Sequence, residues 1–586
     1  MVILNTPDSL NTAFLRHPTV KFLLWGTGSS LLSFLVFSGL PAGNFKFSGE
    51  VMKAAYRQIA ALNTSLRSLK LVFVILSPLL ILQLTLFYGL IDKSPWLSND
   101  SLQYVGFAPW RTLGYPFLVR IIADISNDPN SVTIIQFAVA LLAVGILIAV
   151  IHRLFQSGLV STLAGLFLMT SWPWFFYSYV VLPENLFNAF IVFHLAAAYA
   201  CARKPSSIRF LAAGVTAFFC ILMKPSGIFL LTSIPFFLLV FPGHRWRVMG
   251  SFILPLAFLL GGQSAVNHQV FGYSGLSNFT GTALAPNALH LLKPKPGNRH
   301  ARLSDALSRE ASRYRQEFDR AGYGPGDFDR IRNNFTPMTS IVLAEAARYQ
   351  SVISRGTAAP GEAAQDQPRF FKNGSPLNRS YWALTEKVGY TWEWWPMAPF
   401  WNDLNKTLRE LAIDAHLNNP VEWLKFTSWK LYQGWLEVIP FFSLSRNLGP
   451  NNYVAPQNDG SLIVTRQSAG WIAARQASLS TKIFDGLAAL PFLASLLLPL
   501  PLAILGICLS MSGRFVATVF WGGEFDTRSI VLMYSAICLL VYHFELAVAH
   551  IALTRYVTAG IPFALILLIA ACLSMGAFIQ KRIASS

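Results

Sequence analysis

The chain has 586 residues, of which 53% are hydrophobic and only 13% are charged. Soluble domains carry about 25% charged residues, so this composition excludes a large soluble enzyme and favours an integral membrane protein. The net charge of +18 does not indicate a nucleic-acid partner, because much of the basic excess lies in short connections between apolar runs. We therefore expect membrane lipid around the protein and no nucleic acid among its partners.

Apolar runs recur along the chain, and each is long enough to cross roughly 30 Å of hydrocarbon. They predict an α-helical polytopic membrane protein with about 10 or 11 transmembrane helices. The expected spans are 69–91, 131–152, 158–179, 185–201, 208–223, 228–242, 247–267, 484–510, 528–549 and 556–578, with a further candidate at 20–40.

The basic residues predict which way the helices run. They gather in every second connection, at Arg153, Arg203, Arg245, Arg514 and Lys581. By the positive-inside rule these connections are cytoplasmic, so the alternate connections face outward. We expect a multi-pass protein of the inner (plasma) membrane, with its polar site on the extracytoplasmic face.

Four segments follow from this topology. An N-terminal segment, 1–67, holds the candidate helix at 20–40, and a transmembrane catalytic core, 68–267, includes the first outer loop, 92–130. A mainly helical extracytoplasmic region, 268–483, precedes the C-terminal transmembrane helices and cytoplasmic tail, 484–586. Helices are also expected at 101–108, 114–126, 303–321 and 338–352.

The stretch 421–441 carries aromatic residues at three-residue spacing, which places them on one helical face. Trp and Tyr favour the headgroup zone, so we expect this helix to lie flat on the outer membrane surface. Lys425 and Lys430 are expected elsewhere on its circumference.

The five cysteines all lie in or beside apolar segments, which argues against a disulfide framework or a zinc site. The chain starts without the basic region of a signal peptide, and no nucleotide-binding Gly-x-x-x-x-Gly-Lys motif occurs in it. We assign no metal ligand and no certain cofactor. Whether the protein binds a divalent metal stays open.

Asp100 is the first candidate site residue, since it lies in an outward loop just after a long apolar run. A carboxylate there can take a proton from an attacking hydroxyl. Arg111 follows, with Tyr104 and Tyr115 beside it as further candidates for substrate binding. A guanidinium binds phosphate bidentately and keeps its charge. The alternative for Asp100 is an ordinary solvated acid in a loop, and the alternative for Arg111 is an arginine that snorkels to the membrane interface.

Two outward turns add a second acid and a second cation. Glu184 follows Pro183 and is expected to orient the acceptor or to help hold a divalent metal; a helix N-terminal acid favoured by the dipole is the alternative. Lys224 interrupts an apolar run just before Pro225 opens the next helix. Its ammonium and the N-terminal amides of that helix suit a ligand phosphate, unless the lysine merely snorkels.

The start of the last span supplies the fifth polar group, Arg555 with Tyr556, and His550 precedes it. These three residues are candidates for substrate binding. His543 and Glu545 are interpreted as a buried polar pair, because two ligands do not define a metal site. Together the outward cations and carboxylates suit an anionic lipid phosphate.

Several short motifs resemble the glycosyltransferase C superfamily, in particular its protein O-mannosyltransferase and aminoarabinose or arabinofuranosyl transferase group. They are 99–104, 111–116, 182–187, 224–227, 419–420 and 555–556, spread over roughly 69–270 and 415–578. The resemblance implies transfer of a sugar from a polyprenyl-phosphate donor to a hydroxyl of a glycan, lipid or protein acceptor, usually with inversion.

The resemblance also implies roles for individual residues. Asp100 would be the catalytic base, and Arg111, Lys224 and Arg555 would contact the donor phosphate. The chain departs from the family pattern at Leu113, where proline is common. It also has one acid in the first motif where some relatives have two, which leaves metal dependence open.

Two other functions stay open. A polyprenyl-diphosphate-linked glycan ligase or polymerase would use the outer arginines and a histidine among His290, His300 and His416. A lipid or glycan transporter would need polar residues spread through the membrane midplane, and intramembrane charges are sparse in this sequence.

Overall fold

The computed structural model of the chain describes residues 68–90, 97–98, 101, 104, 111–126, 130–170, 175, 177–178, 180–288, 291, 305, 309, 312, 398–437, 453–456, 462–465, 499–521, 525–549 and 558–585. The helices expected at 20–40, 303–321 and 338–352 lie outside the described residues, apart from a few isolated positions.

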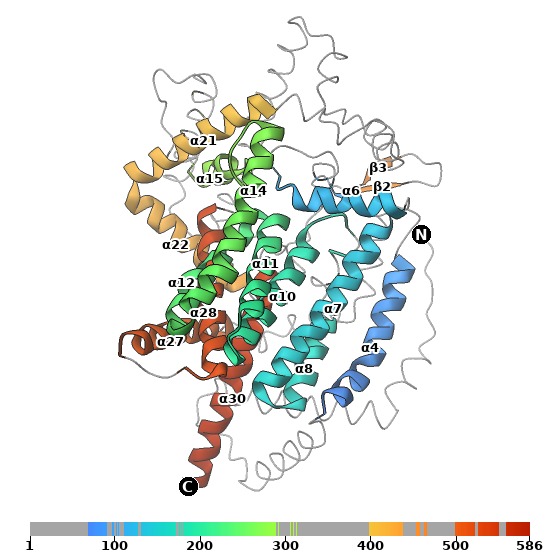
Figure 1. Cartoon of the computed structure of the whole chain (residues 1–586), viewed down its shortest axis with the longest axis vertical. Helices are drawn as coiled ribbons and strands as arrows, with labels where there is room; N and C mark the ends of the chain where they lie inside the picture. The colour runs from blue at the N-terminus through green and yellow to red at the C-terminus, as the bar shows by residue number, and fades with distance from the viewer. Residues whose placement is uncertain are drawn as a thin grey trace, which may run out of the picture.

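A bundle of apolar helices forms the body of the described structure (Figure 1). Its main members are α4 (Leu69–Leu90), α7 (Asn130–Phe155), α8 (Gly158–Thr170), α10 (Glu184–Arg203), α11 (Ser207–Met223), α14 (Leu254–Phe271), α28 (Thr527–Ala549) and α30 (Ile561–Ser585). By length and composition, 5 helices among the described residues can cross a membrane, and shorter apolar helices account for other expected spans. The predicted class, a polytopic helical membrane protein, is confirmed.

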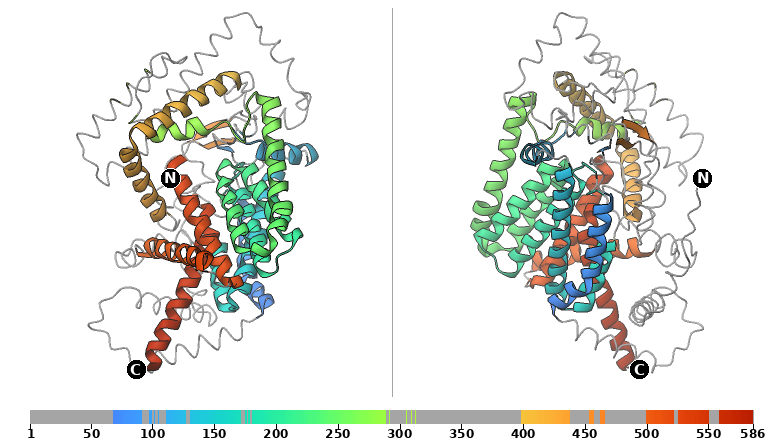
Figure 2. Two further views of the ribbon diagram at one scale, coloured as in Figure 1. Left: turned by 60° about the vertical axis from the view of Figure 1, so that its left-hand side comes forward. Right: turned by 90° about the vertical axis from the view of Figure 1, so that its right-hand side faces the viewer.

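Some helix ends differ from those expected. Helix α8 ends at Thr170 rather than at 179. The span expected at 228–242 is a 3-10 helix, η1 (Pro225–Thr232), that continues into α12 (Ser233–Val240). Helix α27 runs from Pro499 to Trp521, later than the expected 484–510, because Pro499 and Pro501 suit the first helical turn. It runs across the direction of the other helices (Figures 1 and 2).

Helix α10 lies at the centre of the bundle, against α7 and α11, and also contacts α28. A polar network inside the bundle joins three helices: His194 of α10 contacts the Tyr534 hydroxyl at 2.5 Å and Ser233 Oγ at 3.2 Å. Ser233 and Tyr534 are themselves 2.6 Å apart. Polar groups inside a membrane bundle must be satisfied by other protein groups, so this network fixes how α10, α12 and α28 pack.

One end of the bundle is covered by shorter elements (Figure 1). Helix α6 (Gly114–Ser126), expected at 114–126, lies across this end, and α15 (Thr280–Ala288) packs against α21 (Ala398–Asn418). Asn405 of α21 joins that helix to α15. Its Oδ1 accepts a hydrogen bond from Gly281 N at 2.7 Å, and its Nδ2 donates a hydrogen bond to Asn278 at 2.5 Å. A Cβ at Gly281 would lie 2.0 Å from the Asn405 carbonyl oxygen, so only glycine allows this approach.

A small antiparallel sheet joins two distant parts of the chain. Its strand order is β1 (Leu97–Ser98), β2 (Tyr453–Pro456) and β3 (Leu462–Thr465), with Leu97 opposite Val454 and Tyr453 opposite Thr465. The sequence analysis expected a loop around β1 and a mainly helical region around β2 and β3, and it predicted no strand. The sheet holds β2 beside the strand that ends two residues before Asp100.

Helix α22 (Pro420–Glu437) packs against α28 through a face that includes Phe426, Thr427 and Lys430. Lys430 is buried on α22: the residue is 5% exposed, and its ammonium lies 5.5 Å from the Phe426 ring centre. Burial lowers the pKa of Lys430 to about 7. Burial first, and then the charge of Lys430, lowers the pKa of His416 to about 4. The placement of α22 on the membrane surface stays a prediction.

The lowered pKa of Lys430 makes stability depend on pH. Between pH 10.5 and about 7 the unfolded chain binds a proton at Lys430 that the folded chain does not. The protein should therefore lose stability as the pH falls through this window. Lys430→Met should flatten this part of the profile of thermal midpoint against pH in detergent. The matched control is Lys425→Met, because Lys425 lies on the same helix and its side chain is 63% exposed. Parallel profiles for the wild type and Lys430→Met would contradict the prediction.

Candidate functional site

A buried ion pair lies at the end of the bundle that α6 covers. Glu184 begins α10, and Lys224 lies between α11 and η1. The Lys224 Nζ is 3.2 Å from Glu184 Oε1, and the two side chains are 9% and 3% exposed. Removing one member of such a pair leaves a buried charge without its counter-ion, which is strongly unfavourable. The pair therefore ties the start of α10 to the end of α11.

A second carboxylate lies near the same lysine. Glu545 of α28 interacts electrostatically with Lys224 and accepts a hydrogen bond from the backbone N–H of Phe229 in η1. Its Oε2 is buried and has no hydrogen-bond partner among the described residues. The sequence reading grouped Glu545 with His543 and missed its relation to Lys224, because that relation arises only when α28 packs against η1.

Helix α10 also contacts the segment that leads into the last span. Asn188, one turn after Glu184, donates a hydrogen bond to Thr558 Oγ1 at 3.2 Å. Thr558 begins the short 3-10 helix η7 (Thr558–Gly560), two residues after Tyr556. The Asn188 Oδ1 is buried without a hydrogen-bond partner among the described residues. The first turn of α10 is therefore in contact with the C-terminal part of the chain.

An aromatic cluster surrounds Arg111. Its Nη1 lies 3.2 Å from the Tyr104 hydroxyl, and its guanidinium carbon is 4.7 Å from the Tyr104 ring centre and 5.7 Å from that of Phe279. Tyr104 packs edge-to-face on Tyr115 at 5.2 Å. Both tyrosines are buried, whereas Arg111 is partly exposed. The guanidinium is thus held by rings and still reachable.

Hydrogen bonds fix this cluster to the bundle. The Tyr115 hydroxyl donates to Gln136 Oε1 at 2.5 Å, and Gln136 Nε2 donates to the Val180 carbonyl at 3.0 Å. Asn185, next to Glu184, donates to Ser178 Oγ at 2.5 Å. The glutamine thereby links α6, α7 and the segment that leads into α10.

The arginine cluster and the ion pair lie on adjoining segments. Thr112 donates a hydrogen bond to the Met223 carbonyl at 3.2 Å, so the residue after Arg111 contacts the residue before Lys224. A Cβ at Gly114 would lie 2.6 Å from the Leu222 carbonyl oxygen, and only glycine allows this approach. Two cations from distant parts of the sequence therefore converge at one end of the bundle.

The structure brings together five of the nine candidates: Tyr104, Arg111, Tyr115, Glu184 and Lys224. The other four lie outside the described residues, namely Asp100, His550, Arg555 and Tyr556. Sequence reasoning missed Gln136, Asn188 and Glu545, although a polar residue within an apolar span is the signal that could have found them. Within the described ranges, no group of three His, Cys, Asp or Glu residues is placed to hold a metal ion.

Comparison with known families assigns this part of the chain. Residues 111–262 match the family described as dolichyl-phosphate-mannose-protein mannosyltransferase. Over these residues the chain is therefore similar to mannosyltransferases that use a dolichyl-phosphate donor. The matched stretch starts at Arg111 and includes Glu184 and Lys224, so it contains the aromatic cluster's arginine and the buried ion pair. The resemblance expected from the short motifs is confirmed.

One solved structure is similar to this chain: the archaeal oligosaccharyltransferase AglB from Archaeoglobus fulgidus, in complex with an inhibitory peptide and a dolichol-phosphate. The similarity covers 87% of this chain and 51% of that chain, with 12% sequence identity and a TM-score of 0.32. This chain thus spans about half the length of the solved one. No curated protein matches the chain.

The buried ion pair predicts strong energetic coupling between its two members. Glu184→Gln or Lys224→Met alone should each cost about 3 kcal/mol, because the remaining charge stays buried. The double variant should cost less than the sum, by about 1 kcal/mol or more. Thermal unfolding of the four proteins in detergent measures this coupling.

The exposed pair of Glu422 and Lys425, at 2.9 Å, is the matched control. Its coupling should stay below about 0.5 kcal/mol, as for other surface pairs along a helix. Equal coupling in the two cycles would show that burial adds nothing to the Glu184–Lys224 interaction.

Proposed function

We propose that the protein is a glycosyltransferase that moves a sugar from a polyprenyl-phosphate donor to an acceptor hydroxyl on the extracytoplasmic face of the inner (plasma) membrane, with inversion at the anomeric carbon. The observation that carries this proposal is the convergence of Arg111 and Lys224 at one end of the bundle. Two cations there suit a donor phosphate, and Asp100, eleven residues before Arg111 in the sequence, is proposed to supply the base.

The two cations have different surroundings, and we assign them different roles. Arg111 is partly exposed and its guanidinium contacts Tyr104 and Phe279, and we assign it direct contact with the donor phosphate. Lys224 is buried against Glu184, so it contributes positive potential at short range. Charge fixed in advance near a leaving phosphate stabilises the negative charge that develops on it. Glu184 then acts as a positioning residue for Lys224.

The proposed reaction is one displacement. The acceptor oxygen forms a bond to the anomeric carbon while the bond from that carbon to the phosphate oxygen breaks, and the lipid phosphate leaves with the electron pair. Asp100 takes the proton of the acceptor hydroxyl, as a general base. Asp100 directly precedes Ser101, which is fully buried, and lies four residues before Tyr104. The base would thus be attached to the same segment that holds Arg111.

The acceptor side is proposed from the elements that cover this end of the bundle. Helices α15 and α21 lie there, and α15 also contacts α28 (Figure 1). Phe279, next to the start of α15, contacts Arg111. A glycan, lipid or protein acceptor would therefore approach from the side of α15 and α21. His550, Arg555 and Tyr556 are proposed as further substrate contacts, since η7 follows them and contacts α10.

Asp100→Asn tests the proposed base. The substitution should lower sugar transfer by about a thousandfold, because general-base catalysis contributes roughly 10²–10⁴. Purified protein would be given a panel of polyprenyl-phosphate sugars with membrane extract as acceptor, and the anomeric configuration of the product would be read by NMR. The thermal midpoint should not change.

Asn99→Ala, in the same loop, is the control and should keep wild-type transfer. Near-normal transfer by Asp100→Asn would reject this residue as the base. Transfer only from polyprenyl-diphosphate donors would favour a glycan ligase or polymerase over the proposed reaction. Binding of a polyprenyl phosphate without any transfer would favour a transporter.

Arg111 should act mainly on donor binding. Arg111→Met should raise the KM for the donor on the order of tenfold to a hundredfold, because it removes charge-assisted hydrogen bonds to phosphate. Arg111→Lys keeps the charge but loses the planar fork and the stacking on Tyr104, so its KM should be intermediate. Initial rates against donor concentration measure this; an unchanged KM in Arg111→Met would remove the arginine from the donor site.

A further inference from the structure

A cavity of about 530 Å³ lies at the end of the bundle opposite to the proposed site. Its lining includes Arg153, Tyr199, Arg203, Thr527 and Arg528. Helix α10 separates the two places. It has 20 residues, of which Glu184 is the first and Arg203 the last. At 1.5 Å per residue the two ends are about 28 Å apart, so the cavity is distinct from the site of sugar transfer.

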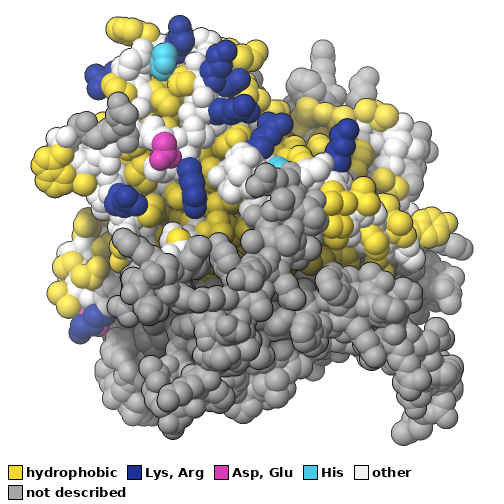
Figure 3. All heavy atoms as spheres, turned by 90° about the horizontal axis from the view of Figure 1, so that it is seen from below, with side chains coloured by type: hydrophobic (Ala, Val, Ile, Leu, Met, Phe, Trp, Pro, Cys, Tyr) yellow, Lys and Arg dark blue, Asp and Glu magenta, His cyan; other side chains and the backbone are white. Residues whose placement is uncertain are grey.

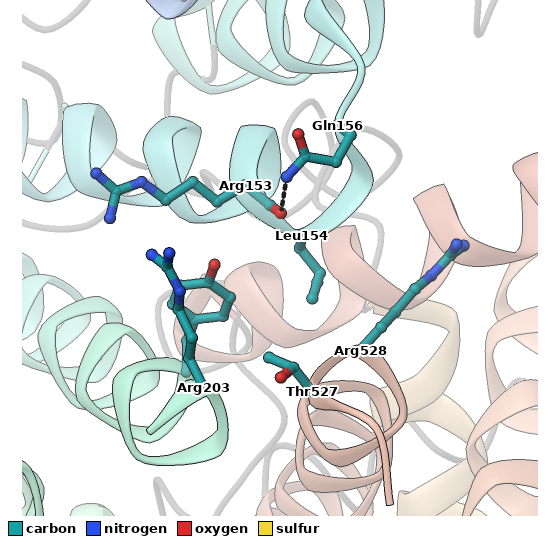
Figure 4. Close-up of a pocket in the computed structure, with 7 residues that line it drawn as sticks. Arg153, Leu154, Gln156, Arg203, Thr527 and Arg528 are labelled. Atoms are coloured by element: carbon teal, nitrogen blue, oxygen red, sulfur yellow. Dashed lines mark hydrogen bonds between the residues drawn. The ribbon is translucent and has the colours of Figure 1, made fainter. Parts of the chain in front are cut away.

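The cavity has three cations from three helices. Arg153 lies in the last turn of α7, Arg203 ends α10, and Arg528 is the second residue of α28. Figure 4 shows Arg153 and Arg203 on one side of the cavity and Arg528 on the other. No Asp or Glu lines the cavity, and no ion pair involves these arginines within the described part of the chain.

These arginines are not needed to cap the helix ends. The carbonyls at the end of α10 accept hydrogen bonds from Arg209, at 3.1 Å for Ala200 and 2.6 Å for Lys204. At the end of α7, the Arg153 carbonyl accepts a hydrogen bond from the Gln156 side chain at 2.8 Å. A basic side chain in the last turn of a helix is expected from the dipole alone, so Arg153 and Arg203 by themselves would carry little weight.

Arg528 does not fit that explanation. It lies in the first turn of α28, where the helix dipole disfavours a cation. The nearby acid, Asp526, accepts hydrogen bonds from Ser529 N at 2.6 Å and Ser529 Oγ at 3.1 Å, so it serves as the helix cap. The Arg528 guanidinium lies 5.1 Å from the Phe155 ring centre, which holds it at the wall of the cavity.

We infer that this cavity binds a phosphate-bearing anion between Arg153, Arg203 and Arg528. Arginine forks match phosphate oxygens bidentately, and three arginines line this cavity. The cavity volume lies in the range of small-ligand sites. In the topology expected from the sequence this end is cytoplasmic, so the phosphate belongs either to an anionic lipid headgroup of that leaflet or to a soluble ion.

The surroundings agree with an anionic ligand. Figure 3 views the molecule from this end, and Lys and Arg side chains gather there on an otherwise largely apolar surface. Such a face meets the negatively charged headgroups of the cytoplasmic leaflet. The inference does not depend on the reaction proposed above, since no residue is shared between the two places.

The test uses full-length protein in nanodiscs of phosphatidylcholine, with or without phosphatidylglycerol. Native mass spectrometry counts the phosphatidylglycerol retained by the protein. The wild type should retain it about tenfold better than Arg153→Gln/Arg203→Gln, because two charge-assisted contacts are lost. Arg247→Gln removes the same charge from an exposed position outside the cavity and should behave as the wild type.

Inorganic phosphate titrated into phosphatidylcholine nanodiscs distinguishes the source. A rise of the wild-type thermal midpoint with phosphate, absent in the double variant, would assign a soluble phosphate ligand. Retention of phosphatidylglycerol without a phosphate effect would assign a lipid headgroup. The two proteins should have the same thermal midpoint in phosphatidylcholine alone. The inference would then be overturned if the wild type and the double variant retained phosphatidylglycerol equally and responded equally to phosphate.

Discussion

A charge inside an apolar helix bundle requires a counter-charge, and this constraint organises the proposed site. Lys224 meets it with Glu184, at 3.2 Å, and with the field of Glu545. These residues come from the end of α11, the start of α10 and the far part of α28, so satisfying one lysine fixes three helices relative to one another. A lipid environment offers no water as a substitute.

Close backbone approach then brings the second cation to the same place. Thr112 bonds to the Met223 carbonyl, and Gly114 leaves no room for a side chain against Leu222. Arg111 is thereby kept beside the turn that contains Lys224 while its guanidinium stays partly exposed. In the proposed reaction the partly exposed arginine would contact the anionic donor directly, while Glu184 would hold Lys224 in place.

Helix α10 connects the two polar ends of the protein. Its first residue is an acid in the proposed site, and its last is an arginine in the opposite cavity, about 28 Å away. Between them lies His194, bonded to Tyr534 and Ser233, so the interior of the helix is also fixed by polar contacts. A phosphate at the cavity would therefore act on the end of the helix that the transfer site does not use.

The sequence by itself determined the membrane class, most helix positions and the candidates Arg111, Glu184 and Lys224, because hydropathy, charge and turn residues are local signals. Tertiary structure alone decided that Glu184 and Lys224 pair, that Glu545 lies near them and that three arginines line the opposite cavity. Each of these contacts joins helices distant in the chain, and a single sequence contains no record of which helix faces pack together. Local patterns fix what each segment is; packing fixes which side chains meet.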